Sequence, residues 1–149
     1  MNTFEVSDDK ARLDRDAIHR FLSEDAYWCR GIGRATVDRA IDGSLCFGAY
    51  RETTQVGFAR VVTDRATFAY LCDVFVLPEY RGQGVARGIL GAVDRHPALQ
   101  GLRRFLLFTR DKHPLYAKFG FTPLARPERG MERLNDNVYR NSSQPESST

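Results

Sequence analysis

The chain has 149 residues, of which 42% are hydrophobic and 28% are charged. This length can bury the core of one domain and is too short for two substantial ones. The composition excludes disordered, collagen-like and coiled-coil proteins. The formal net charge of +3 comes without a dense Lys/Arg run between aromatic residues, so we expect no nucleic acid as a partner.

The cysteine spacing and the lengths of the apolar segments indicate the cellular compartment and whether a metal site is expected. Cys29, Cys46 and Cys72 stand at wide spacings without a C-x-x-C pair, and no secretory hydrophobic region opens the chain. No stretch approaches the roughly 20 apolar residues of a membrane span. We therefore expect a soluble, cytoplasmic protein with no membrane partner. No His/Cys/Asp cluster has ligand spacing, so we expect no metal.

The first third of the chain predicts a short strand and two helices. Residues Thr3 to Val6 alternate weakly, as in a strand, and apolar residues recur at helical spacing from Leu13 to Leu22. A second short helix is expected from Ala35 to Ile41, ending at a glycine. Between the helices, Tyr27 and Trp28 lie in a stretch with two glycines, which indicates a loop.

Three predicted strands follow, at Leu45–Tyr50, Val56–Val62 and Phe68–Leu77. Short polar connections of hairpin length join them, so we expect an antiparallel meander. The third strand is the longest and most apolar, which favours a central position. A single carboxylate, Asp73, interrupts it.

The second half predicts a strand-loop-helix-strand unit. Pro78 closes the central strand, and the helix from Val85 to about Val93 precedes a buried strand at Arg104–Thr109. Because a helix separates the two strands, they should be parallel neighbours.

The C-terminal part predicts one more helix and one more strand. A short helix around Leu115–Phe119 leads to a last strand beginning at Phe121. The tail 136–149 has nothing to bury, so we expect it to be disordered after a single domain at 1–135. The element order indicates an α+β fold with a mixed sheet.

The loop Arg81-Gly82-Gln83-Gly84-Val85-Ala86 carries the clearest chemical signal. It delivers the chain from a strand into a helix, whose first N–H groups and positive dipole end bind anions. Two glycines at this spacing, taken alone, are as typical of a tight turn as of an anion-binding loop. The loop lacks the G-K-[ST] of a P-loop, and it is not the G-x-G-x-x-G of a dinucleotide fold, so ATP and NAD are disfavoured.

The strand and loop from Val74 to Ala86, followed further on by Leu115-Tyr116-Ala117-Lys118-Phe119-Gly120-Phe121, resemble the GCN5-related N-acetyltransferase (GNAT) superfamily. The loop matches the [Q/R]-x-x-G-x-[G/A] signature at Arg81, Gly84 and Ala86. The resemblance covers residues 55–124 well. It implies a GNAT-like fold, with a mixed, mostly antiparallel sheet of six or seven strands, a splayed parallel pair and about four flanking helices.

The resemblance also implies acetyl-CoA as co-substrate. The backbone of Phe75 and Val76 would pair with the pantetheine amides. Thr109 stands where relatives often carry Asn, and it can still form a hydrogen bond to the cofactor. The pyrophosphate would be held by the Arg81 side chain and by the amides of the loop, which are Gly82, Gln83, Gly84, Val85 and Ala86.

The chain departs from the family pattern at three other positions. Lys112 stands where relatives often have Ala, so the helix starts differently or the lysine reaches toward phosphate. Gly88 and Gly91 inside the predicted helix each cost about 1 kcal/mol relative to alanine. They would allow close packing.

Two residues are expected to carry the chemistry. Tyr116 occupies the position where relatives often place the tyrosine that protonates the departing thiolate, and a phenol stays protonated at neutral pH. The alternative is an aromatic packed on the core. Asp73 would take the proton from the amine or bind an ammonium group, with pairing to a nearby arginine as the alternative. Tyr27 and Trp28 would contact the acceptor, or simply pack.

The resemblance thus implies an N-acetyltransferase that moves an acetyl group from acetyl-CoA to a primary amine of a small molecule by direct attack in a ternary complex. A protein or peptide acceptor stays open, as does a non-catalytic acyl-CoA-binding module. Homodimers are common in the family, so we expect one, although no sequence feature requires it.

Overall fold

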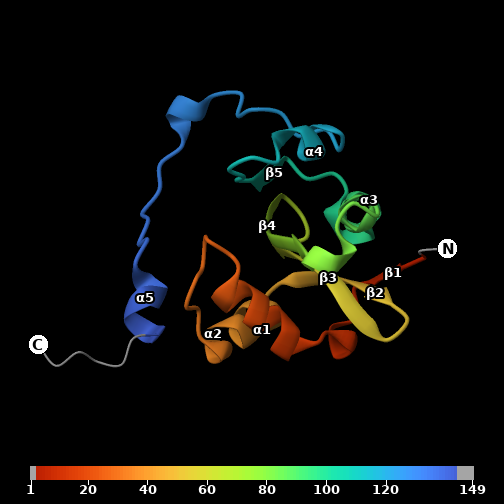
Figure 1. Ribbon diagram of the computed structural model, residues 1–149. Helices are drawn as coiled ribbons and strands as arrows, with labels where there is room; N and C mark the ends of the chain where they lie inside the picture. The colour runs from red at the N-terminus through yellow and green to blue at the C-terminus, as the bar shows by residue number, and fades with distance from the viewer. Residues whose placement is uncertain (1–2, 144–149) are drawn as a thin grey trace, which may run out of the picture.

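The computed structural model describes residues 3–143 (Figure 1). Short 3₁₀ turns connect several of the elements. In chain order, the strands and helices are β1 Glu5–Ser7, α1 Arg15–Glu24, α2 Arg34–Asp42, β2 Leu45–Arg51, β3 Thr54–Thr63, β4 Phe68–Val76, α3 Val85–Arg95, β5 Arg104–Leu107, α4 His113–Ala117 and α5 Val138–Ser143.

The strands form one sheet in the order β1-β2-β3-β4-β5. The first four are antiparallel neighbours, as the predicted meander requires, and β4 and β5 are the expected parallel pair. The register of that pair runs from Phe68 opposite Arg104 to Leu71 opposite Leu107. The pairing therefore ends in the middle of β4.

Helices cover both faces of the sheet (Figure 1). On one face, α3 buries Val85, Ile89, Leu90 and Val93 against β2, β3 and β4. On the other face, α1 and α2 bury a second cluster that includes Ile18 and Phe58. The sheet thus has a core on each side, and the strand that carries Asp73 lies between them.

Gly88 of α3 is explained by packing. A Cβ atom built there would lie 2.5 Å from the ring of Phe4, so the helix needs a residue without a side chain at this point. At Gly91 the nearest atom is the end of the flexible Arg95 side chain, at 3.0 Å. Close packing, one of the expectations for these glycines, is confirmed at Gly88.

A bulge interrupts β4. Phe58 pairs with Phe75 and Arg60 with Cys72, so Ala59 of β3 faces two residues, Asp73 and Val74. Asp73 adopts a left-handed backbone with φ of 53°, a conformation that Asp tolerates better than most residues. Such bulges re-aim side chains, and they occur often next to active sites.

The C-terminal part differs from the prediction. The described residues contain five strands, where six or seven were expected, and five α-helices, where about four were expected. Phe121 begins no strand, because Pro123 and Pro127 cannot donate backbone hydrogen bonds to a ladder. The disorder predicted for the tail 136–149 stays a prediction: the structure describes α5 at Val138–Ser143, and residues 144–149 lie outside the described part. No described helix is long and apolar enough to cross a bilayer.

Candidate functional site

A cleft of about 1030 Å³ opens where β4 and β5 separate. Beyond Leu71, β4 continues to Val76, while β5 stops at Leu107, so the second half of β4 has a free edge. Phe75 and Val76 line the cleft on this edge. An extended amide-bearing ligand could add to such an edge as a further strand.

The free edge leads to the N-terminus of α3. Gly82 and Gly84 have φ of 76° and 83°, and Gly84 is the N-cap of this 11-residue helix, without a side-chain cap. A Cβ atom built at either glycine would meet nothing within 4 Å, so open space lies in front of the loop. Uncapped N–H groups, a helix dipole and this open space fit a phosphate group.

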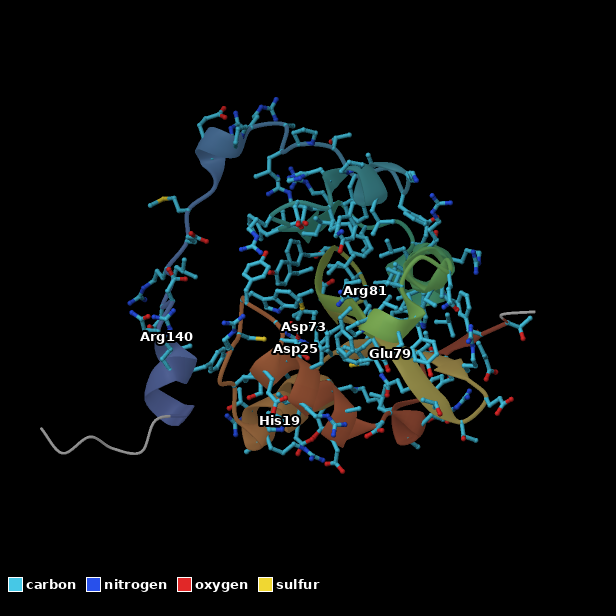
Figure 2. All side chains as sticks on the ribbon, viewed as in Figure 1. His19, Asp25, Asp73, Glu79, Arg81 and Arg140 are labelled. Atoms are coloured by element: carbon cyan, nitrogen blue, oxygen red, sulfur yellow. The ribbon has the colours of Figure 1, made fainter. Side chains whose placement is uncertain are left out.

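Arg81 and Gln83 of the loop behave differently. Arg81 lines the cleft, and its Nε donates to the Val76 carbonyl at 3.0 Å, which ties the loop to the end of β4 (Figure 2). Gln83 is absent from the cleft wall. Its Oε1 accepts a 2.6 Å hydrogen bond from Nη2 of Arg51, whose guanidinium also lies 5.2 Å from the centre of the Tyr80 ring. Arg51, the last residue of β2, therefore braces the loop.

Tyr116 is buried in α4 and lines the same cleft. Burial raises the pKa of its phenol, and the nearby Tyr27 raises it further. Its ring also meets Phe121 edge to face, at 6.2 Å. The phenol is therefore held protonated across the neutral range and can donate a proton into the cleft.

Each carboxylate oxygen of Asp73 accepts a hydrogen bond from a neighbouring side chain. Its Oδ1 accepts a hydrogen bond from Nε1 of Trp28, and its Oδ2 one from Nε of Arg60, both at 2.8 Å. Arg60 in turn donates to the hydroxyl of Ser44 at 3.1 Å. The structure thus contains the arginine pair that was the alternative reading of Asp73. The carboxylate nevertheless lines the cleft, as does Asp25 (Figure 2).

Aromatic side chains form the wall around Asp73. The rings of Tyr27 and Trp28 meet edge to face at 5.1 Å, and both line the cleft. Their contact with an acceptor stays a prediction. The guanidinium of Arg110 lies 3.8 Å from the centre of the Tyr27 ring. Tyr70 and Phe108 add a second edge-to-face pair at 6.1 Å.

Thr109 and Lys112 mark the start of α4. The Thr109 hydroxyl accepts a 3.0 Å hydrogen bond from the backbone N–H of Lys112, the residue that precedes the helix. Both residues line the cleft. In this structure the Thr109 hydroxyl thus caps the residue before α4, and a hydrogen bond from Thr109 to the cofactor stays a prediction.

Sequence reasoning missed four residues of this site: Arg51, Arg60, Tyr70 and Arg110. Arg60 offered a signal, because it is the one charged residue among the buried positions of β3. Arg51, Tyr70 and Arg110 offered none, since their contacts depend on which distant segments the fold brings together. Among the described residues, no group of three His, Cys, Asp or Glu side chains could hold a metal ion.

Comparisons with known proteins agree on one family. The family model described as "Acetyltransferase (GNAT) domain" matches residues 42–123. A Gibberella zeae protein named as a "putative acetyltransferase" is 39% identical over 135 residues, covering 76% of this chain and 75% of that protein. The crystal structure of a "putative acetyltransferase belonging to the gnat family" from Xanthomonas campestris is 54% identical, with a TM-score of 0.91 over 93% of this chain and 98% of that one.

A more distant structure shares the fold. AAC(6')-Iy in complex with the bisubstrate analogue CoA-S-monomethyl-acetylneamine is 20% identical and has a TM-score of 0.61, over 89% of this chain and all of that chain.

Proposed function

The chain belongs to the GNAT acetyltransferase family, and we propose that it transfers the acetyl group of acetyl-CoA to a primary amine of a small molecule. One observation carries the proposal. β4 loses its partner after Leu71, and its free edge runs directly into the loop at the N-terminus of α3. An extended chain with amides at one end and a diphosphate at the other fits this combination.

The cofactor end would use mainly backbone groups. The free edge at Phe75 and Val76 would pair with the pantetheine amides, and the amides of 82–86 with the Arg81 side chain would hold the pyrophosphate. The open space in front of Gly82 and Gly84 supports this fit. The complex of AAC(6')-Iy with a CoA-containing analogue supports the same ligand on this fold.

The reaction we propose is direct attack in a ternary complex. The amine nitrogen attacks the thioester carbonyl carbon, the C–N bond forms as the C–S bond breaks, and the sulfur leaves as the thiol. Tyr116 donates the proton that the sulfur needs, because its phenol is protonated and faces the cleft. The proton lost by the amine passes to water and restores the tyrosine through the solvent.

Asp73 is assigned to the acceptor. Both of its oxygens already accept a hydrogen bond, but a carboxylate has lone pairs for further donors. We propose that it holds the amine in line with the thioester, with Tyr27 and Trp28 as the flanking wall. The alternative is that Asp73 is the base that removes the proton from the amine. The two roles predict different pH profiles of the rate for an Asp73→Asn variant.

The test combines binding and turnover. Acetyl-CoA binding measured by calorimetry, and thiol release measured over a panel of amines, aminoglycosides and peptides, should show amine-dependent release by the wild type and strongly reduced release by Tyr116→Phe. Binding without turnover on any amine would favour the non-catalytic module. Turnover confined to peptides would favour a protein acceptor. Absence of acetyl-CoA binding would overturn the proposal.

A further inference from the structure

Arg110 lies in the loop that leads from β5 to α4, and it lines the candidate active-site cleft. The central carbon of its guanidinium lies 3.8 Å from the centre of the Tyr27 ring, which belongs to the loop between α1 and α2. A guanidinium stacks well on an aromatic face, and stacking leaves the N–H groups along its edge open to a ligand. The contact therefore holds a positive charge in place where the two loops meet.

The Arg110 guanidinium has no anionic partner among the described residues. No hydrogen bond or ion pair within residues 3–143 involves its side chain, whereas Arg60, for comparison, pairs with Asp73 at 2.8 Å. Arg110 is also exposed, so its donors are accessible from the cleft. Its fork of N–H groups matches two oxygens of a carboxylate or a phosphate. Arg110 is thus a positioned cation whose anion does not come from the described part of the chain.

Contacts connect Arg110 to the residues assigned to the reaction. The Tyr27 ring beside Arg110 meets the Trp28 ring edge to face at 5.1 Å. Nε1 of Trp28 donates in turn to the Asp73 carboxylate at 2.8 Å. Burial raises the pKa of the Tyr116 phenol, and Tyr27 lies near enough to raise it further. An acceptor that lies along the Tyr27–Trp28 wall therefore meets both the Arg110 charge and the Asp73 carboxylate.

Three other ionic side chains, those of Asp25, Asp111 and Lys112, line the same cleft. No hydrogen bond or ion pair among the described residues fixes the charged group of any of them. A side chain that is already held in place loses little conformational entropy when a ligand binds to it. Arg110, held against Tyr27, is therefore better prepared to bind an ion than these three.

We propose that Arg110 binds an oxyanion of the acceptor, which makes the preferred acceptor a small amine that carries a carboxylate or a phosphate. The inference rests on the proposed acetyl transfer and adds the class of acceptor. Such a molecule is held at two points, by its amine at Asp73 and by its anion at Arg110, and this orients the nitrogen toward the thioester. A diamine is disfavoured, because its second ammonium group would face the guanidinium.

Matched pairs of amines test the proposal. β-Alanine and β-alaninamide differ only in a carboxylate against a carboxamide, and O-phosphoethanolamine and ethanolamine differ only in the phosphate. Diaminobutane carries a second cation instead of an anion. Thiol release from acetyl-CoA gives kcat/KM for each amine. The pair whose selectivity depends on Arg110 identifies the oxyanion as a carboxylate or a phosphate.

Arg110→Gln should lower kcat/KM for the anionic member of the pair about ten- to a hundredfold, as for loss of a hydrogen-bonded charge. Arg110→Glu should in addition favour diaminobutane. Arg104→Gln is the matched control, because it removes the same charge from an exposed residue of β5 that does not line the cleft. The selectivity within each pair should stay as in the wild type in this control. The different basicity of the paired amines cancels, because each variant is compared with the wild type on the same amines.

Unchanged selectivity in Arg110→Gln overturns the inference, and so does an equal change in Arg104→Gln, which would reflect net charge alone. If the amines are still acetylated in that case, the proposed function stands. If no amine is acetylated by the wild type, the proposed function fails for this panel, and binding decides the inference.

Trp28 makes this binding measurable without turnover. It is the only tryptophan of the chain and lines the cleft, so its fluorescence reports an acceptor that binds there. The anionic amine should bind more tightly than its neutral counterpart, and Arg110→Gln should abolish the difference. Equal binding of both members of each pair to the wild type overturns the inference.

Discussion

Trp28 and Asp73 come from distant parts of the chain and meet in a 2.8 Å hydrogen bond from the indole Nε1 to Oδ1. The bond joins the loop between α1 and α2 to the bulge in β4. The bulge lies next to the free edge that we assign to the cofactor. The acceptor wall and the cofactor edge are therefore positioned by the same few residues of β4.

Asp73→Asn should weaken both stability and acceptor use. Asn tolerates the positive φ, so the backbone should stay in place. The variant leaves Arg60 without its charge partner at a site where the two side chains are 19% and 11% exposed. Since the amide can still accept a hydrogen bond, we expect the free energy of unfolding to fall by about 1–3 kcal/mol.

Kinetics separate the two roles of Asp73. If it orients the amine, the KM for the acceptor should rise about tenfold, as for loss of one charged hydrogen bond, while the KM for acetyl-CoA stays unchanged. If it is the base, kcat should fall instead, and the acid limb of the wild-type pH profile should disappear. Asp25→Asn, which changes an exposed carboxylate of the same cleft, is the control and should leave stability unchanged.

Tyr116→Phe should lower kcat about a hundredfold or more, the usual contribution of a positioned general acid, with little change in the KM for acetyl-CoA. Tyr50→Phe is a matched control. Tyr50 is also buried, but its hydroxyl has no hydrogen-bond partner among the described residues and Tyr50 does not line the cleft, so this variant should keep full activity.

The raised pKa of Tyr116 determines how stability and the reaction rate should depend on pH. Its pKa is raised by burial, so the folded protein holds the proton more tightly than the unfolded chain, whose tyrosines titrate near about 10. The contribution of the protonated Tyr116 phenol to the free energy of unfolding is fully present below the pKa of the unfolded chain. It is lost as the pH rises through the pKa of Tyr116 in the folded protein. The rate should therefore show no loss attributable to Tyr116 between neutral pH and about 9. A wild-type loss of kcat in that range that Tyr116→Phe abolishes would contradict the assignment.

Arg51→Ala should weaken acetyl-CoA binding from outside the cleft. The change removes the 2.6 Å bond to Gln83 and the contact with Tyr80, so the loop loses its brace. One such bond is worth about 1 kcal/mol, which corresponds to about a fivefold rise in the KM for acetyl-CoA. The KM for the acceptor should not change.

A double-mutant cycle checks that Arg51 acts through Gln83. Gln83→Ala should have a similar effect on the acetyl-CoA KM, and the double variant should add little to either change. Fully additive effects would show that Arg51 contacts the ligand directly.

The two glycines of α3 should respond in opposite ways to alanine. Gly88→Ala forces a methyl group onto the Phe4 ring and should lower stability by about 1–3 kcal/mol, as overpacking does. Gly91→Ala meets only the end of Arg95 and should gain about 0.5–1 kcal/mol of helix propensity. Urea unfolding of both variants measures this, and Phe4→Leu should relieve Gly88→Ala. Equal effects at both positions would mean that Phe4 packs elsewhere.

Local patterns predicted most of the fold. The strands of the meander were found to within one or two residues, because alternation and short polar turns are properties of neighbouring residues. The parallel pair followed from the helix between its strands. The strand expected at Phe121 was wrong because Pro123 and Pro127 cannot donate to a ladder. The ring contacts that hold Phe121 against Phe105 and Tyr116 are not encoded by any local pattern.

The candidate site was predictable in part. The loop glycines and Tyr116 stand in motifs, and the structure brings them to one cleft. The partners of Asp73 were out of reach, because the bulge that turns it toward Arg60 and Trp28 depends on how β3 and β4 align. The brace from Arg51 depends in the same way on the end of β2, which is distant in the sequence from the loop.

The Phe4 ring against Gly88 also constrains the order of folding. During synthesis, Phe4, the residue before β1, leaves the ribosome long before α3 exists, so its ring has to wait for its site. The contact joins residues far apart in the sequence, and the entropy of closing that long loop delays it. We expect the first strand to dock late, after the meander has formed, and thereby to lock the cofactor helix into place.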